Sequence, residues 1–173
     1  MKVLNKKIEN SISSINSKFT GKPIKGKFKE EALQELGLFV EVVAKDERRH
    51  EINIPSFLYW IKPAILHNQY LFFYDEGDIN PTGYILWAWV DEKTLYSYLN
   101  SKQFILHPMC WNEGKNLIIV DFVCLNKSDT RFTLHNLYRK LRHKVSMSYK
   151  DVNVSIRNSE GSIIKHNREN SNE

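Results

Sequence analysis

Residues 116–125 constrain the fold more than any other part of the sequence. They read Asn-Leu-Ile-Ile-Val-Asp-Phe-Val-Cys-Leu, which is apolar at both alternating sets of positions. We therefore expect a strand that is buried on both faces. Asp121 interrupts this run, and because an unpaired buried carboxylate is costly, the fold must supply it with a cation, a hydrogen-bond donor or a proton. Asp121 is thus a candidate functional residue, with pairing to a lysine or capping of a helix as the structural alternative.

The patterns on either side predict helices and strands that together form an α/β (α+β) domain. Pro55 suits the first turn of a helix, and Pro63 is expected to end or kink that helix. Asp91 is expected to cap a short helix, and Asp129 or Thr130 a longer one. Periodicity also predicts a helix in residues 32–43 and strands at 69–75, 84–90 and 152–156. This order favours a single domain with a mixed central sheet flanked by helices on both faces.

Composition divides the 173 residues into three parts. Residues 1–29 are basic and carry apolar residues at steps of three and four, which predicts an N-terminal extension with an amphipathic character. Residues 30–157 form the globular domain, since 42% hydrophobic residues are enough for one core. Residues 158–173 are polar, and we expect them to be a disordered tail. No stretch has the pattern of a signal peptide or a membrane span, so we expect a cytoplasmic protein.

Charge and residue spacing exclude several kinds of site. The net charge of +5 favours an acidic partner without identifying it as nucleic acid, an anionic membrane or an acidic protein. Cys110 and Cys124 lie too far apart for a CxxC pair, and the histidines lack metal-ligand spacing, so we expect no metal site. The seven glycines form no phosphate-binding cluster, which disfavours a nucleotide or coenzyme A donor.

His50 is the second candidate functional residue. It ends a charged loop, residues 45–50, that precedes a predicted helix, and reactive groups are commonly presented on such loops. The residues alone do not distinguish it from a surface histidine.

A series of short motifs occurs in order between Leu36 and Ile156. They are Pro63-Ala-Ile, Asn68-Gln-Tyr70, Pro81 before Gly83-Tyr84, Trp87-Ala88, Tyr98-Leu-Asn100, Trp111, Ile119-Val-Asp121-Phe, and Leu137-Tyr138 followed by Leu141-Arg142 and Lys144. In their order and spacing the chain resembles the toxin-activating lysine acyltransferases, the family of the haemolysin activator.

This resemblance implies a GNAT-like fold and a specific reaction. The family transfers a fatty acyl group from acyl carrier protein to internal lysines of an RTX-type protoxin, with no cofactor besides the acyl carrier protein itself. Its essential histidine falls on His50, and its essential aspartate falls on Asp121. Where the family usually has a serine before the histidine and Trp-Pro after it, this chain has Glu47 and Ile54-Pro55.

The resemblance also suggests roles for individual residues. His50 would act as a general base on the protoxin lysine, and Asp121 would orient the imidazole or hold the incoming ammonium. A transient acyl-histidine is a second route. Arg139 and Arg142 would contribute to a docking face for the acidic acyl carrier protein, with a solvated helix face as the alternative.

Two other functions stay open on the sequence. One is a GNAT-type transferase that uses acyl-coenzyme A on a small amine. The other is a non-enzymatic module in which aromatic residues such as Tyr70, Phe72, Tyr74 and Trp87 stack on single-stranded nucleic acid, although core packing explains these residues more simply. On the acyltransferase hypothesis we expect no nucleic-acid partner. The acyl-chain length, the modified lysines, homodimer formation and the role of the N-terminal extension are not determined by the sequence.

Overall fold

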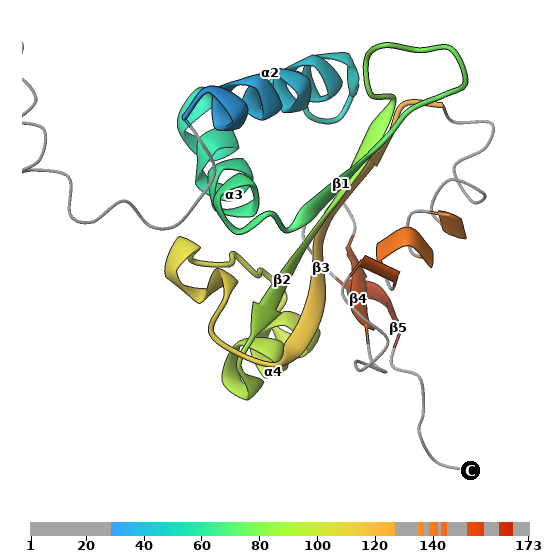
Figure 1. Ribbon diagram of the computed structural model, residues 1–173. Helices are drawn as coiled ribbons and strands as arrows, with labels where there is room; N and C mark the ends of the chain where they lie inside the picture. The colour runs from blue at the N-terminus through green and yellow to red at the C-terminus, as the bar shows by residue number, and fades with distance from the viewer. Residues whose placement is uncertain are drawn as a thin grey trace, which may run out of the picture.

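The computed structural model describes residues 29–126, 135–136, 139–141, 143–144, 152–157 and 163–167. Its sheet has the strand order β1-β2-β3-β4-β5, in which β3 and β4 are parallel and the other neighbours are antiparallel (Figure 1). The elements are the helices α2 (Lys29–Lys45), α3 (Ile54–His67) and α4 (Glu92–Asn100), the short 3-10 helix η1 (Pro108–Trp111), and the strands β1 (Tyr70–Phe73), β2 (Gly83–Val90), β3 (Asn116–Cys124), β4 (Val152–Arg157) and β5 (Ile163–Asn167).

Two hydrophobic cores lie on opposite faces of the central strands. One core joins α2, α3 and α4 to alternate residues of β2, among them Tyr84 and Leu86. The other contains Ile85 and Trp87 from the same strand, together with Leu141 from the helical residues 139–141. Figure 1 shows α2 and α3 on one side of the sheet and these later helical residues on the other. The mixed sheet with helical cover on both faces is therefore confirmed, while the GNAT-like character stays a prediction.

Polar side chains cap the starts of two helices, and the Asp91 cap is the one that the sequence predicts. The Asn53 side chain accepts the Ser56 N–H at 2.9 Å at the start of α3, and the Asp91 carboxylate accepts the Thr94 N–H at 2.7 Å at the start of α4. Asn68 ends α3 in a left-handed conformation with φ of 55°. The longer helix predicted from Asp129 or Thr130 begins outside the described residues.

The structure corrects part of two expectations. Pro63 is expected to end or kink α3. It does not end this helix, which continues to His67, because buried residues on both sides of the proline, Ile61 and Ala64, hold the helix in the core. The tail predicted to be disordered contains β5, which pairs with β4 from Val154↔Asn167 to Arg157↔Ile163. An edge strand can be held by backbone hydrogen bonds to one neighbour and need not be apolar. The mostly polar sequence of β5 therefore gave only a weak signal for a strand.

A β-bulge in β3 decides which face Asp121 occupies. Leu86 pairs with Asp121, yet the next residue, Trp87, pairs with Ile119, so Val120 is an extra residue in β3. Strict alternation would place Asp121 on the face of Ile119. The bulge reverses this and turns the carboxylate toward Tyr84 and the layer of α2 and α3.

Tyr98 joins β3 to β4 where their pairing ends. The parallel pairs are Leu117↔Val152 and Ile118↔Asn153, and the next rung in this register would connect the Ser155 N–H to the Ile119 carbonyl. The Tyr98 hydroxyl lies in that rung: it accepts from Ser155 N–H at 2.7 Å and donates to Ile119 O at 2.8 Å. Helix α4 therefore supplies a side-chain link between the two strands.

Replacing Tyr98 by phenylalanine should lower the free energy of unfolding by about 1–3 kcal/mol, because two backbone groups lose their partner while the ring still packs. Urea unfolding followed by circular dichroism measures this change. Tyr96, which is 70% exposed, is the matched control, and Tyr96→Phe should change stability by less than about 0.5 kcal/mol. Equal effects of the two variants would contradict the proposed link.

Two glycines should respond in opposite directions to alanine. Gly37 lies inside α2 with open space where the alanine methyl group would be added, so Gly37→Ala should stabilise the protein by about 0.5–1 kcal/mol. At Gly83 the added Cβ would clash with the Val123 carbonyl oxygen of the neighbouring strand, so Gly83→Ala should cost about 1–3 kcal/mol. Urea midpoints that move in the same direction for both variants would contradict the packing described for β2.

Candidate active site

Asp46 organises the turn between α2 and α3. Its backbone carbonyl accepts the N–H groups of Arg49 and His50, both at 2.9 Å. Its carboxylate accepts the Arg48 N–H at 3.0 Å. The side chain is only 8% exposed, so a buried carboxylate lies under a turn that carries two arginines and a histidine.

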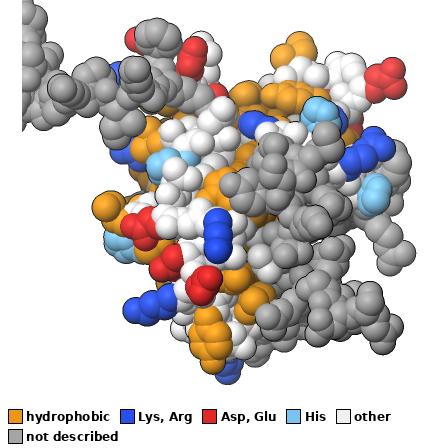
Figure 2. Space-filling model, turned by 60° about the horizontal axis from the view of Figure 1, so that its bottom comes forward, with side chains coloured by type: hydrophobic (Ala, Val, Ile, Leu, Met, Phe, Trp, Pro, Cys, Tyr) orange, Lys and Arg blue, Asp and Glu red, His pale blue; other side chains and the backbone are white. Residues whose placement is uncertain are grey.

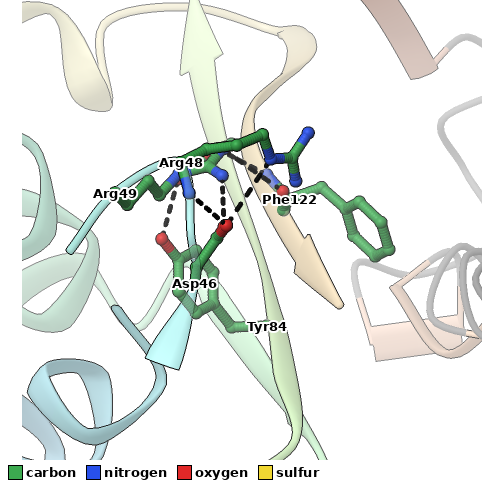
Figure 3. A network of polar contacts seen from close by, with 6 residues as sticks. Asp46, Arg48, Arg49, Tyr84 and Phe122 are labelled. Atoms are coloured by element: carbon green, nitrogen blue, oxygen red, sulfur yellow. Dashed lines mark hydrogen bonds and ion pairs between the residues drawn. The ribbon is translucent and has the colours of Figure 1, made fainter. Parts of the chain in front are cut away.

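Arg49 joins this turn to the central sheet (Figure 3). Its guanidinium donates from Nη1 to Asp46 Oδ2 at 2.6 Å and from Nη2 to Asp121 Oδ1 at 2.5 Å. Nη2 also lies 3.4 Å from the Phe122 carbonyl oxygen. The side chain is 20% exposed, so one largely enclosed cation bridges two carboxylates from distant parts of the chain.

Both carboxylate oxygens of Asp121 have donors. Oδ1 accepts from Arg49 and from the Phe122 N–H at 2.8 Å, and Oδ2 accepts from the Tyr84 hydroxyl at 2.8 Å. The Asp121 side chain is 15% exposed, so it is largely but not fully buried. The fold supplies it with a cation and with donors, and the cation is an arginine rather than a lysine. The bulge at Val120 makes this arrangement possible.

The contacts in this network shift the pKa values of its members. Burial alone would raise the pKa of Asp46, but the Arg48 N–H and the Arg49 guanidinium outweigh it and hold this pKa below its ordinary value. Burial opposes the charge of Arg49, yet Asp121 and Asp46 raise its pKa. Burial and the Asp121 charge both raise the pKa of Tyr84 well above its usual range. Arg49 therefore stays charged, and Tyr84 stays a neutral donor.

His50 lies next to Arg49 but faces solvent. Its side chain is 50% exposed, and Nε2 is 3.8 Å from Glu51 Oε1. Among the described residues no hydrogen bond joins His50 to Asp121; the connection runs through Arg49 and the turn. Sequence reasoning did not find Arg49, Asp46 or Tyr84. The charged loop was a signal for the first two, but nothing local predicts a contact between residues 49 and 121.

An open cleft of about 380 Å³ lies beside the network. Its walls come from the turn and from the end of β3, namely Lys45, Asp46, Glu47, Arg48, Phe122, Cys124 and Leu125. Polar and apolar groups both contribute. Within the described part of the chain, no group of three His, Cys, Asp or Glu residues could hold a metal ion. Both cysteines are free.

His50, Asp121 and Arg139 are not among the residues that line this cleft. Arg139 is exposed and helical, two residues before the buried Leu141, whereas Arg142 lies outside the described residues. On the face shown in Figure 2, basic side chains are interspersed with acidic and apolar ones. Of the four aromatic residues considered for base stacking, Tyr70 and Trp87 are 8% and 2% exposed and belong to the cores, Phe72 is partly buried, and Tyr74 is 44% exposed.

A largely enclosed charge network beside a cleft is a candidate functional site. Comparison with protein-family models shows the class of protein, because the model of the RTX toxin acyltransferase family matches residues 28–159. A search of curated proteins finds no match to the sequence. The chain belongs to the RTX toxin acyltransferase family and is thus a toxin-activating acyltransferase. In the described residues no helix is long and apolar enough to cross a membrane.

The lowered pKa of Asp46 predicts a pH-dependent stability. A carboxyl group whose folded pKa lies below its unfolded value of about 3.8 stabilises the fold fully above that pH, and this contribution is lost as the pH falls through the lower folded pKa. Asp46→Asn should therefore cost about 1–3 kcal/mol at pH 7, and the difference from wild type should shrink below about pH 4.

Urea unfolding at pH 7, 5 and 3 tests this dependence. Asp78→Asn, at an exposed position, is the control and should have little effect at any of these pH values. A difference between wild type and Asp46→Asn that stays constant or grows on acidification would contradict the assignment.

Proposed function

We propose that this protein activates an RTX-type protoxin by transferring a fatty acyl group from acyl carrier protein to internal lysines of that protoxin, in the cytoplasm. The family match over residues 28–159 is the observation that carries the proposal. The donor and the lysine target follow from the resemblance of the sequence motifs. The buried network adds a physical framework for the two candidate residues, His50 and Asp121.

In the proposed reaction, neutral His50 accepts a proton from the protoxin lysine ammonium. The free amine then attacks the carbonyl carbon of the acyl thioester and forms a C–N bond. The C–S bond breaks, and the leaving thiolate of acyl carrier protein takes up the proton that the attacking nitrogen loses as the amide forms, while His50 releases its proton to solvent. The half-exposed position of His50 supports this role, because the acceptor is a large protein that must approach from solvent.

The contacts of Asp121 argue against one of the two roles that the resemblance suggests for it, the orientation of the His50 imidazole. Both of its oxygens bind donors from Arg49, Phe122 and Tyr84, so direct orientation of the His50 imidazole is not the arrangement that these contacts favour. The alternative nucleophilic route would form an acyl-histidine at His50. It needs no contact between the imidazole and Asp121 and is therefore compatible with the same geometry.

The proposed docking face for acyl carrier protein includes Arg139 and Arg142. Leu141 is fully buried against the sheet, and Arg139 is exposed on the same helical segment, as a docking residue must be. The net charge of +5 would speed the encounter with an acidic partner. No further cofactor is required, because the acyl group arrives as an activated thioester.

Mass spectrometry of the cognate protoxin tests the function directly. Incubation with acyl-loaded acyl carrier protein and wild-type protein should add the acyl mass to protoxin lysines, whereas acyl-coenzyme A in a parallel reaction should give none. His50→Ala should lower the rate by about 100-fold or more, because general-base assistance is lost.

His67→Ala is the control for this experiment, since His67 is an exposed histidine at the end of α3. It should acylate at the wild-type rate. An unmodified protoxin with wild-type protein, or transfer from acyl-coenzyme A alone, would overturn the proposed donor or reaction.

A further inference from the structure

The two residues implicated in acyl transfer belong to separate elements without a direct bond. His50 ends the turn after α2, and Asp121 lies inside β3. In the described residues the side chain that connects the turn to Asp121 is Arg49, the immediate neighbour of His50. The influence of Asp121 on His50 therefore has a structural route through this arginine.

The turn has little freedom once Arg49 is bound. The N–H groups of Arg49 and His50 both donate to the Asp46 carbonyl, and the Ile52 N–H donates to the Arg49 carbonyl at 2.9 Å. The Arg49 guanidinium binds the Asp46 carboxylate at the same time. A displacement of Arg49 must therefore displace His50 as well.

We propose that Arg49 is a positioning residue for acyl transfer, and that Asp121 acts on His50 through Arg49 rather than by contacting the imidazole or the substrate. This proposal rests on the proposed function of the site. Arg49 clamps the end of α2 to β3 and so fixes the turn that presents His50. The charged and titratable groups that face Asp121 are Arg49 and, from β2, Tyr84; Asp46 lies on the other side of the guanidinium.

The geometry requires arginine rather than lysine at this position. A planar guanidinium directs Nη1 to Asp46 and Nη2 to Asp121, with the Phe122 carbonyl within 3.4 Å of the latter. The ammonium group of a lysine is a compact point charge. It can neutralise the charge of the two carboxylates, but it cannot hold both of them through two directed hydrogen bonds as the guanidinium does. Arg49→Lys should therefore preserve the fold better than Arg49→Met while restoring the position of His50 only in part.

A double-mutant cycle on acyl transfer tests whether Asp121 acts through Arg49. Arg49→Met and Asp121→Asn should each lower kcat by about 100-fold, with the KM for acyl-loaded acyl carrier protein changed less than about threefold. The double variant should be no slower than the slower single variant, because both substitutions break the same link. Losses that multiply in the double variant would show that Asp121 contributes independently, and would overturn the proposal.

The ring resonances of His50 provide a second readout that needs no activity. In histidine-labelled protein, NMR should show the His50 signals moving toward the values of an unstructured peptide in Arg49→Met, with Arg49→Lys between this variant and wild type. Arg48→Met is the matched control, since Arg48 is 72% exposed and its side chain only reaches Asp46 Oδ1, at 3.5 Å, so this substitution should leave the His50 signals in place.

Unmoved His50 signals in folded Arg49 variants would overturn the clamp. If Arg49→Met does not fold, Arg49→Lys replaces it in the double-mutant cycle and in the NMR comparison, and the same outcomes decide. If wild-type protein fails to acylate the protoxin, the proposed function fails, and the NMR comparison still decides whether Arg49 positions His50.

Discussion

The contact between Arg49 and Asp121 is the interaction on which the arrangement of this site depends. It connects the turn after α2 to the central strand, at an Nη2–Oδ1 distance of 2.5 Å. The two side chains are 20% and 15% exposed, so leaving either charge unpaired would be unfavourable, although less so than the cost of about 3–5 kcal/mol that is typical of a fully buried pair. Asp46 and Tyr84 complete the network by occupying the second amino group of the arginine and the second oxygen of the carboxylate. These four side chains together hold the geometry of the site.

Much of this fold could be predicted because its signals are local. The apolar run of β3, the Asp91 cap of α4 and the aromatic pattern of β2 each depend on residues close in sequence. That Asp121 needs polar partners was predictable too, since a carboxylate in an apolar strand must have a partner. That partner was not predictable, because the contact spans 72 residues and depends on a bulge at Val120 that reverses the side-chain alternation. Tertiary packing likewise overrides the local effect of Pro63 in α3.

The structure also changes how the two residues suggested by the family resemblance relate to one another. A histidine and an aspartate invite comparison with a hydrogen-bonded catalytic pair, in which the carboxylate orients the imidazole. Here the carboxylate binds an arginine, and the imidazole of the next residue in the chain is half exposed. In the proposed reaction the two residues would therefore divide the work differently: the aspartate would anchor the turn through Arg49, and the turn would present the histidine to a substrate from solvent. Membership of the RTX toxin acyltransferase family defines the class of reaction, and this geometry suggests how the fold organises it.

Chemical rescue is the most direct test of the claim that the Arg49–Asp121 link organises acyl transfer. Arg49→Ala would be assayed for protoxin acylation with and without millimolar ethylguanidinium, which can occupy the vacated space between the two carboxylates. The account predicts that the added cation restores much of the lost rate in Arg49→Ala and none of the loss in Asp121→Asn. An Arg49→Ala variant that is fully active without the cation, or an inactive but folded variant that ethylguanidinium binds without restoring activity, would contradict it.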